Sequence, residues 1–198
     1  MHNPVKPLWL MADSSPFFHG PKGPTWFADE LERRGYRLDR AFYAGHANDH
    51  QAAHFAIFTA AMAPVVSETA CRQLIKNGDW DQNWRVGDLL LLAGGDPRKL
   101  ATPETRAAVT RALQQGVLII GISAGAIFLG RAWEEATPML GTVPYVIDAH
   151  QEDTNWQRLR ALGSLPLLGL PWRSVVEWDA ASGLGSLYGP VPWMGPSP

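Results

Sequence analysis

The sequence predicts an α/β fold built around a mostly parallel sheet. Apolar, strand-like runs alternate along the chain with segments of helical periodicity, which is typical of βαβ units. Some predicted strands are apolar almost throughout, such as residues 88–93, in which Asp88 is followed by a continuous apolar run, as expected for strands that are covered on both faces. The chain has 198 residues and 46% apolar composition and shows no linker or repeat, so we expect a single domain over residues 1–198.

The first half contains two strand-helix units. Residues 7–12 form the first predicted strand, and a loop rich in Gly and Pro over residues 13–24 precedes a helix over residues 25–34, which ends at Gly35. Residues 40–44 form the second strand, followed by a helix over residues 50–62. Residues 68–75 are predicted as a further helix, with Cys71 as a packing residue.

The second half repeats the alternation. The strand at residues 88–93 ends in Gly94-Gly95, and Thr102-Pro103 opens a helix that closes at Gly116. A strand over residues 117–120 leads to a small-residue turn and a second apolar run at residues 126–129. Further predicted elements are a strand at 143–147, a short helix to residue 160 and edge strands within residues 172–188.

Composition narrows the partners and the compartment. The formal net charge is -2 and basic residues are mixed with acidic ones, so nucleic acid and anionic membrane are unlikely partners. The lone Cys71 cannot form an internal disulfide, the N-terminus lacks the apolar core of a signal peptide, and no apolar run is long enough to span a bilayer. We therefore expect a cytoplasmic protein that acts on small molecules or peptides.

The turn Gly121-Ile122-Ser123-Ala124-Gly125 carries the main chemical signal. A serine between small residues, where a buried strand turns sharply into a helix, is the pattern of a nucleophile elbow. The alternative is that the small residues only let the helix pack closely on the sheet. Because ligands bind at the carboxyl ends of parallel strands, the Gly94-Gly95 loop and the segment ending in His150 are expected near Ser123.

Each of these neighbours has a use in acyl transfer. Serine needs a base to take its proton, and His150 is the best placed histidine, whereas His2, His19, His46, His50 and His54 are predicted as solvated loop or helix residues. The backbone N–H groups of Gly95 and Ala124 are the predicted oxyanion donors. The alternative for Gly94-Gly95 is an ordinary tight turn.

Together these motifs resemble the S51 serine peptidases, which include dipeptidase E and cyanophycinase. The resemblance rests on Ala93-Gly94-Gly95-Asp96, the Ser123 elbow and Asp148-Ala149-His150, and covers most of the chain from Tyr43 onward. It implies a flavodoxin-like, three-layer sandwich of the class I glutamine-amidotransferase type, with no metal and no organic cofactor. It assigns the nucleophile to Ser123, the base to His150 and the oxyanion hole to Gly95 and Ala124. We predict substrate contacts at Gly94 and Asp96 of the same loop, although Asp96-Pro97-Arg98 stands where dipeptidase E-like proteins tend to have further Gly, Asn and Thr.

The chain departs from the family pattern where an acid should orient the histidine. The stretch Trp178-Asp179-Ala180-Ala181 stands where the family has Asp-Glu-Gly-Thr-Ala, so Ala180 replaces the expected glutamate. Glu177 and Asp179 share one face of the predicted strand and are the first substitutes. Further candidates are Glu152 and the pair Glu134-Glu135, and a dyad without an acid also remains open.

Substrate preference is not fixed by a motif. Recognition of an aspartyl side chain would need a cation, for which Arg98, Arg131 and Arg173 are candidates. Alternatively, tryptophans near predicted loops, such as Trp172, could line an apolar subsite. The apolar residues Trp193 and Met194 fit either a homodimer surface or a loose tail.

The leading hypothesis is a serine peptidase that cleaves a small peptide, possibly an aspartyl dipeptide. The second is a ligand-binding or regulatory protein that keeps the amidotransferase-like fold but has lost activity, motivated by the missing acid. An α/β-hydrolase esterase ranks last, because the 26 residues between Ser123 and His150 leave little room for the acid of that fold.

Overall fold

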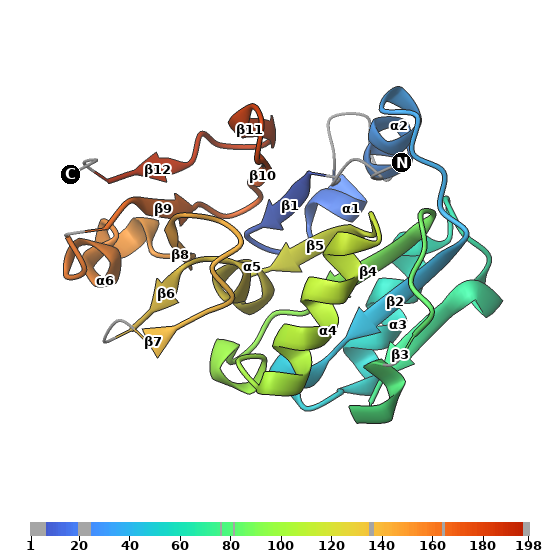
Figure 1. Ribbon diagram of the computed structural model, residues 1–198. Helices are drawn as coiled ribbons and strands as arrows, with labels where there is room; N and C mark the ends of the chain where they lie inside the picture. The colour runs from blue at the N-terminus through green and yellow to red at the C-terminus, as the bar shows by residue number, and fades with distance from the viewer. Residues whose placement is uncertain are drawn as a thin grey trace.

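A seven-stranded sheet forms the centre of the molecule (Figure 1). The computed structural model describes residues 7–19, 25–75, 77–80, 82–134, 137–163 and 165–195. The sheet has the order β11-β10-β1-β5-β4-β2-β3. Its parallel strands are β1 (Leu8–Met11), β2 (Arg40–Ala44), β3 (Cys71–Leu74), β4 (Asp88–Leu92) and β5 (Leu118–Ile122). Next to β1, strand β10 (Val175–Asp179) pairs antiparallel with β1 and with the edge strand β11 (Gly183–Tyr188).

Helices cover both faces of this sheet. One face carries α4 (Pro103–Gln114) and α5 (Ala124–Leu129), and the other carries α1 (Pro16–His19), α2 (Trp26–Arg33) and α3 (Ala52–Met62). In β1, Leu8 and Leu10 pack toward α4 and α5, while Trp9 and Met11 pack toward α1 and α2. Alternate residues of a strand therefore enter two separate cores. The predicted three-layer α/β sandwich with a mostly parallel sheet is confirmed.

A second, smaller sheet lies beside α5. Strands β8 (Val146–Ala149) and β9 (Leu167–Leu170) are parallel, and β12 (Trp193–Met194) pairs antiparallel with β9. The hairpin β6 (Ala132–Trp133) and β7 (Thr137–Pro138) and helix α6 (Gln157–Arg160) pack nearby (Figure 1). Contacts between α5 and β8 bring the end of β8 toward the edge of the central sheet.

The C-terminal apolar pair belongs to this small sheet. The ring of Trp193 stacks on that of Trp156 with 6.0 Å between centroids, and the Arg160 guanidinium lies 4.9 Å from the Trp193 ring. The prediction of a loose tail at these residues is therefore wrong. Met194 is 44% exposed, and the prediction of a dimer surface here stays a prediction.

Most predicted elements occur within a few residues of their expected bounds, but residues 68–75 differ. Instead of a helix, a short 3₁₀ turn over Glu68–Ala70 precedes strand β3, and Cys71 pairs with Ala41 of β2. The segment is short, and its backbone N–H and C=O groups pair with those of β2, so it forms an edge strand. This tertiary pairing overrides the local helical pattern. The thiol of Cys71 is partly buried and free, and burial raises its pKa.

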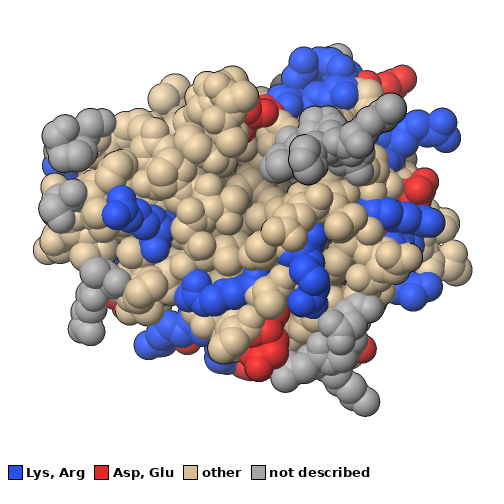
Figure 2. All heavy atoms as spheres, viewed as in Figure 1, with Lys and Arg blue, Asp and Glu red and all other residues tan. Residues whose placement is uncertain are grey.

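Charge is dispersed over the surface. In the face shown in Figure 2, Lys and Arg side chains lie in separate groups, with Asp and Glu side chains among them and wide uncharged areas between. Within the described ranges, no helix combines the length and the apolar character needed to cross a membrane.

Candidate active site

Ser123 lies at the sharp turn between β5 and α5. Its backbone angles, φ 47° and ψ −106°, are outside the conformations that a residue with a side chain prefers. The Ser123 N–H donates to the Met11 carbonyl at 2.8 Å, and the Ser123 carbonyl accepts from Ile127 N–H at 2.9 Å. The turn is thus fixed to β1 on one side and to the helix on the other. A non-glycine residue held in such a conformation costs about 1–3 kcal/mol, and strain of this kind is typical of functional sites.

The glycines beside Ser123 are required by close packing. A Cβ added at Gly125 would overlap with the carbonyl oxygen of Leu92, and one added at Gly121 would lie 2.6 Å from the carbonyl carbon of Gly125. Helix α5 therefore packs directly on strands β4 and β5. The packing interpretation of this motif is confirmed, and the same packing fixes the sharp turn that presents Ser123. The role of Ser123 as a nucleophile stays a prediction.

Gly94 and Gly95 follow β4 and lie next to the turn. A Cβ at Gly94 would be 3.5 Å from Cβ of Ser123. Gly95 has φ +137°, and a Cβ there would overlap with the Ala47 carbonyl, so only glycine fits. Ala124 is the first residue of α5, so its N–H has no acceptor within the helix. Ala124 is therefore part of the Ser123 turn, and Gly95 belongs to the neighbouring loop whose Gly94 approaches Ser123. Their role as oxyanion donors stays a prediction.

His150 follows β8 and reaches the same cavity from the small sheet. Its backbone N–H donates to the Leu170 carbonyl at 3.2 Å, and its ring stacks on the Trp172 ring with centroids 3.6 Å apart. Burial lowers the pKa of His150 below its ordinary value, while the charges of Asp13 and Glu152 oppose this shift. The imidazole is therefore biased toward the neutral form, which is the form that can accept a proton.

The ring of His150 is incompletely satisfied. Its Nδ1 atom is buried and has no hydrogen-bond partner among the described residues, and the same is true of Oε2 of Glu152. The other carboxylate oxygen of Glu152 accepts the backbone N–H of Trp172 at 2.8 Å. One carboxylate oxygen of Asp13 accepts the Ser15 N–H and the other the Arg173 N–H, each at 2.6 Å. Glu152 and Asp13 are thus the two carboxylates whose charges most favour protonated His150.

Glu177 and Asp179 are not brought to His150. Strand β10 runs antiparallel to β1, so it leads away from the carboxyl ends of the parallel strands. Both carboxylate oxygens of Glu177 accept from Arg34, each at 2.5 Å. Asp179 accepts the backbone N–H groups of Ala181 and Ser182 in its own turn. The structure does not support the prediction that either residue orients the histidine, because both serve the opposite end of the sheet.

Other predicted residues have structural partners as well. Glu134 pairs with Arg158 at 3.2 Å, and Arg158 also holds the buried Asp148, while Glu135 lies outside the described residues. Asp96 accepts from the Arg98 backbone at 3.0 Å and pairs with the Arg98 guanidinium at 2.9 Å. Asp96 therefore caps the turn after Gly95 and, unlike Gly94 and Gly95, does not line the cavity, contrary to its predicted substrate contact.

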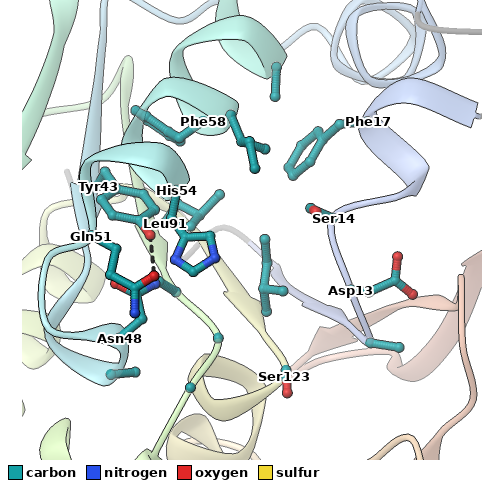
Figure 3. Close-up of a pocket in the computed structure, with 18 of the residues that line it drawn as sticks. Asp13, Ser14, Phe17, Tyr43, Asn48, Gln51, His54, Phe58, Leu91 and Ser123 are labelled. Atoms are coloured by element: carbon teal, nitrogen blue, oxygen red, sulfur yellow. Dashed lines mark hydrogen bonds between the residues drawn. The ribbon is translucent and has the colours of Figure 1, made fainter.

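A cavity of about 530 Å³ opens at Ser123. Figure 3 shows Ser123 at one end and Phe17 and Phe58 at the other, with His54 on one side and Asp13 opposite. Gly94, Gly95 and His150 also contribute to its walls. The volume falls within the range of about 300–1,000 Å³ that is typical of ligand sites.

Several cavity residues were not predicted. Asp13 lies two residues after the end of β1, so the rule that selected the ends of β4 and β5 could also have selected it. His54 lines the cavity and is exposed, whereas both ring nitrogens of His46 are buried without a hydrogen-bond partner among the described residues. The prediction of a solvated His46 is wrong, because its ring stacks on Trp80 at 5.1 Å and contacts His50 at 4.3 Å.

Within the described part of the chain, no group of three or more His, Cys, Asp or Glu side chains is arranged to hold a metal ion. The groups that converge at the cavity are instead a hydroxyl, an imidazole, carboxylates and backbone N–H donors. These groups can form and stabilise a covalent acyl intermediate.

Comparison with known proteins adds the fold relationship. No family model matches the sequence, and no curated protein matches it. Among solved structures, a peptidase from an acI-B1 actinobacterium has a TM-score of 0.69 at 14% identity, over 98% of this chain and 92% of that one. The chain has a peptidase-like fold. A candidate peptidase E protein from Listeria monocytogenes EGD-e has a TM-score of 0.66 at 12% identity, over 93% of this chain and 99% of that one. At these identities the likeness establishes the peptidase E-like fold and does not by itself assign an activity.

Proposed function

We propose that the protein is a serine peptidase that hydrolyses a small peptide through an acyl-enzyme. The strained turn at Ser123 carries this proposal, because it presents a serine hydroxyl to a cavity that also contains His150 and the backbone of Gly95. The peptidase-like fold supports the same conclusion. Close packing explains the tight turn, but it requires neither a serine at that turn nor a histidine from a separate sheet on the wall of the same cavity.

In the proposed reaction, Ser123 Oγ attacks the peptide carbonyl carbon while His150 takes the hydroxyl proton. The N–H groups of Gly95 and Ala124 stabilise the oxyanion of the tetrahedral intermediate. The C–N bond then breaks and the leaving amine receives the proton from His150. Water attacks the resulting ester with His150 again as base, releasing the acid and regenerating Ser123.

Glu152 is the residue we assign to orient His150. It lies two positions after the histidine, its Oε2 is buried without a partner among the described residues, and the partnerless Nδ1 of His150 needs an acceptor. Trp172 connects the two, since its ring stacks on His150 and its backbone N–H holds the other oxygen of Glu152. A side-chain rotation that joins Nδ1 to Oε2 would satisfy both atoms. Catalytic hydrogen bonds are often formed only when substrate is bound.

The proposal is tested by turnover. A panel of dipeptides is incubated with the protein and with the Ser123→Ala and His150→Gln variants, and release of free amino acids is measured. We expect hydrolysis by the unmodified protein and a loss of at least about 1,000-fold in each variant. Hydrolysis that survives in Ser123→Ala would contradict the proposal.

The partnerless Nδ1 of His150 favours one other candidate, a ligand-binding protein without turnover. A histidine without an orienting acceptor is a weak base, so this reading predicts saturable peptide binding and no hydrolysis across the panel. Binding measured by calorimetry, together with the turnover assay, separates the two functions.

A further inference from the structure

We infer that the cavity beside Ser123 selects a substrate with an apolar side chain on the residue whose carbonyl is attacked, and that it excludes an acidic one. The inference rests on the proposed function for the direction of the bond. Its physical basis, however, is the composition of the cavity wall. The side-chain preference that this wall produces can be measured as binding affinity, without turnover.

The far part of the cavity is apolar and preformed. Phe17 of α1, Phe58 and Ala61 of α3 and Leu91 of β4 line it, and each of these side chains is no more than 5% exposed. Phe58 packs against Tyr43 with ring centroids 5.3 Å apart, which fixes its position. Figure 3 shows Phe17 and Phe58 facing the cavity from two different helices, at the end away from Ser123. A branched aliphatic or aromatic side chain entering here would exchange water for apolar contacts.

The polar groups on the wall do not suit a carboxylate. Of the described residues, no Lys or Arg lines the cavity, and the carboxyl side chains that do line it are those of Asp13 and Asp49. The Tyr43 hydroxyl accepts a hydrogen bond from Asn48 Nδ2 at 2.8 Å and keeps its own O–H as a donor, while Asn48 Oδ1 is an acceptor without a partner among the described residues. The donors among these neutral groups can offer a carboxylate single hydrogen bonds but no neutralising charge. Asp49 is already paired with Lys99 Nζ at 2.6 Å, whereas among the described residues Asp13 accepts only from neutral donors. An aspartyl side chain would lose hydration without gaining an unpaired cation, and it would approach the like charge of Asp13.

The three arginines proposed from the sequence to bind an aspartyl side chain do not supply a cation to the cavity. Arg98 is paired with Asp96, and neither Arg131 nor Arg173 lines the cavity. Arg173 contributes only its backbone N–H, which is held by Asp13. The cation that recognition of an aspartyl residue requires is therefore not found on the described cavity wall.

The arrangement of the two sheets decides which part of the substrate enters the apolar end. His150 comes from β8, which packs against α5 on one side of the central sheet, whereas the apolar wall belongs to the core on the other side, with α1 and α3. A histidine that protonates the leaving amine must lie on the leaving-group side of the bond. The acyl residue then points away from His150, toward Phe17 and Phe58.

The experiment measures binding to the Ser123→Ala protein at pH 8, where imidazole side chains are generally neutral. Isothermal titration compares Phe-Leu, Leu-Leu and Asp-Leu. We expect Phe-Leu and Leu-Leu to bind at least 10-fold more tightly than Asp-Leu. Equal affinities, tighter binding of Asp-Leu, or no binding of any of the three at millimolar concentration would overturn the inference.

A charge placed on the wall sharpens the test. Ile57 lines the cavity from α3 and is 42% exposed, so Ile57→Arg adds a cation without disturbing the core. We expect it to shift the ratio of Asp-Leu to Phe-Leu affinity by at least 10-fold toward Asp-Leu. Val191→Arg, at a position that is 82% exposed and does not line the cavity, is the matched control and should leave the ratio unchanged. An unchanged ratio in Ile57→Arg would contradict the inference.

The two proposals fail in different ways. If the unmodified protein hydrolyses dipeptides through Ser123 with no apolar preference, the selectivity inference fails and the peptidase proposal stands. If the apolar dipeptides bind selectively but are never hydrolysed, the peptidase proposal fails and the cavity remains an apolar peptide site.

Discussion

The two sides of the site are built differently. Ser123 follows β5 of the central sheet, and its N–H donates to the Met11 carbonyl of β1. Helix α5 packs so closely on the sheet that a Cβ at Gly125 would overlap with the Leu92 carbonyl, and one at Gly121 would lie 2.6 Å from the Gly125 carbonyl carbon. His150 follows β8 of the small sheet, and its Nδ1 has no hydrogen-bond partner among the described residues. Its ring stacks on that of Trp172, a residue that is itself 52% exposed. The serine turn is fixed by main-chain hydrogen bonds and close helix packing, whereas the His150 ring is held by stacking on Trp172 and by a hydrogen bond to the Ala12 backbone. We therefore expect the nucleophile to be preorganised and the base to be completed by substrate.

The largest expected effect is on the serine side. Ser123→Ala should lower kcat/KM by about 10⁴-fold or more, because no acyl-enzyme can form. The variant keeps the Cβ and hence the packing of the turn, so its melting temperature should change little. Ser14 also lines the cavity, and Ser14→Ala is the matched variant. A larger loss in Ser14→Ala than in Ser123→Ala would refute the assignment.

The rigidity of the turn predicts the next effect. Gly125→Ala would force a methyl group onto the Leu92 carbonyl, and we expect a loss of about 3 kcal/mol in the free energy of unfolding, measured by urea denaturation. Gly185 of β11 has nothing within 4 Å of an added Cβ, so Gly185→Ala should change stability by less than about 0.5 kcal/mol. Equal effects of the two substitutions would show that α5 is not tightly packed.

On the histidine side, Glu152→Gln should lower kcat by about 100-fold with little change in stability. The charge of Glu152 raises the pKa of His150, so its removal should also move the acidic limb of the kcat/KM profile to lower pH. Glu134→Gln is the control. Because Glu134 pairs with Arg158, this substitution should leave both kcat and the acidic limb of the kcat/KM profile unchanged. If Asp13→Asn produces these changes and Glu152→Gln does not, the orienting acid is Asp13.

A substitution at Glu177 should lower the stability of the protein without lowering its activity. Glu177→Gln removes the carboxylate that Arg34 contacts at the opposite end of the sheet, leaving a partly buried guanidinium with a weaker partner. We expect about 2 kcal/mol lower stability by thermal or chemical denaturation and kcat/KM within twofold of the unmodified protein. A selective loss of activity would restore Glu177 as the orienting acid.

The smallest expected effect concerns pH. Burial, with a further contribution from the charge of His50, lowers the pKa of His46 from 6.5 to about 4. Below pH 6.5 the unfolded chain binds a proton that the folded protein does not, so stability falls as pH decreases and the loss levels off near pH 4. At pH 5.5 this amounts to about 1 kcal/mol relative to pH 7.5. The loss should disappear in His46→Phe, as measured by the free energy of unfolding at both pH values.

The same contrast explains what could be predicted from the sequence. The Ser123 turn and the Gly94-Gly95 loop are local features, in which small residues follow apolar runs, so their placement follows from the pattern. The orienting acid and the substrate cavity depend on contacts between distant segments. Glu177 is predicted only as a substitute near the family's acid position, which Ala180 occupies, and the antiparallel direction of β10 and the pairing with Arg34 remove it from the site. Phe58 and Phe17 line one cavity only because α3 and α1 lie on the same face of the sheet. No local pattern contains that information.

The most direct test of the serine assignment is covalent labelling followed by peptide mapping. The cavity contains two serine side chains, Ser14 and Ser123, both visible in Figure 3, so the site of modification is informative. After reaction with a fluorophosphonate, our account predicts one adduct per chain, located on Ser123, with a reaction rate that falls when His150 is replaced by Gln. An adduct on Ser14, or an unmodified Ser123 in protein that hydrolyses peptides, would contradict it.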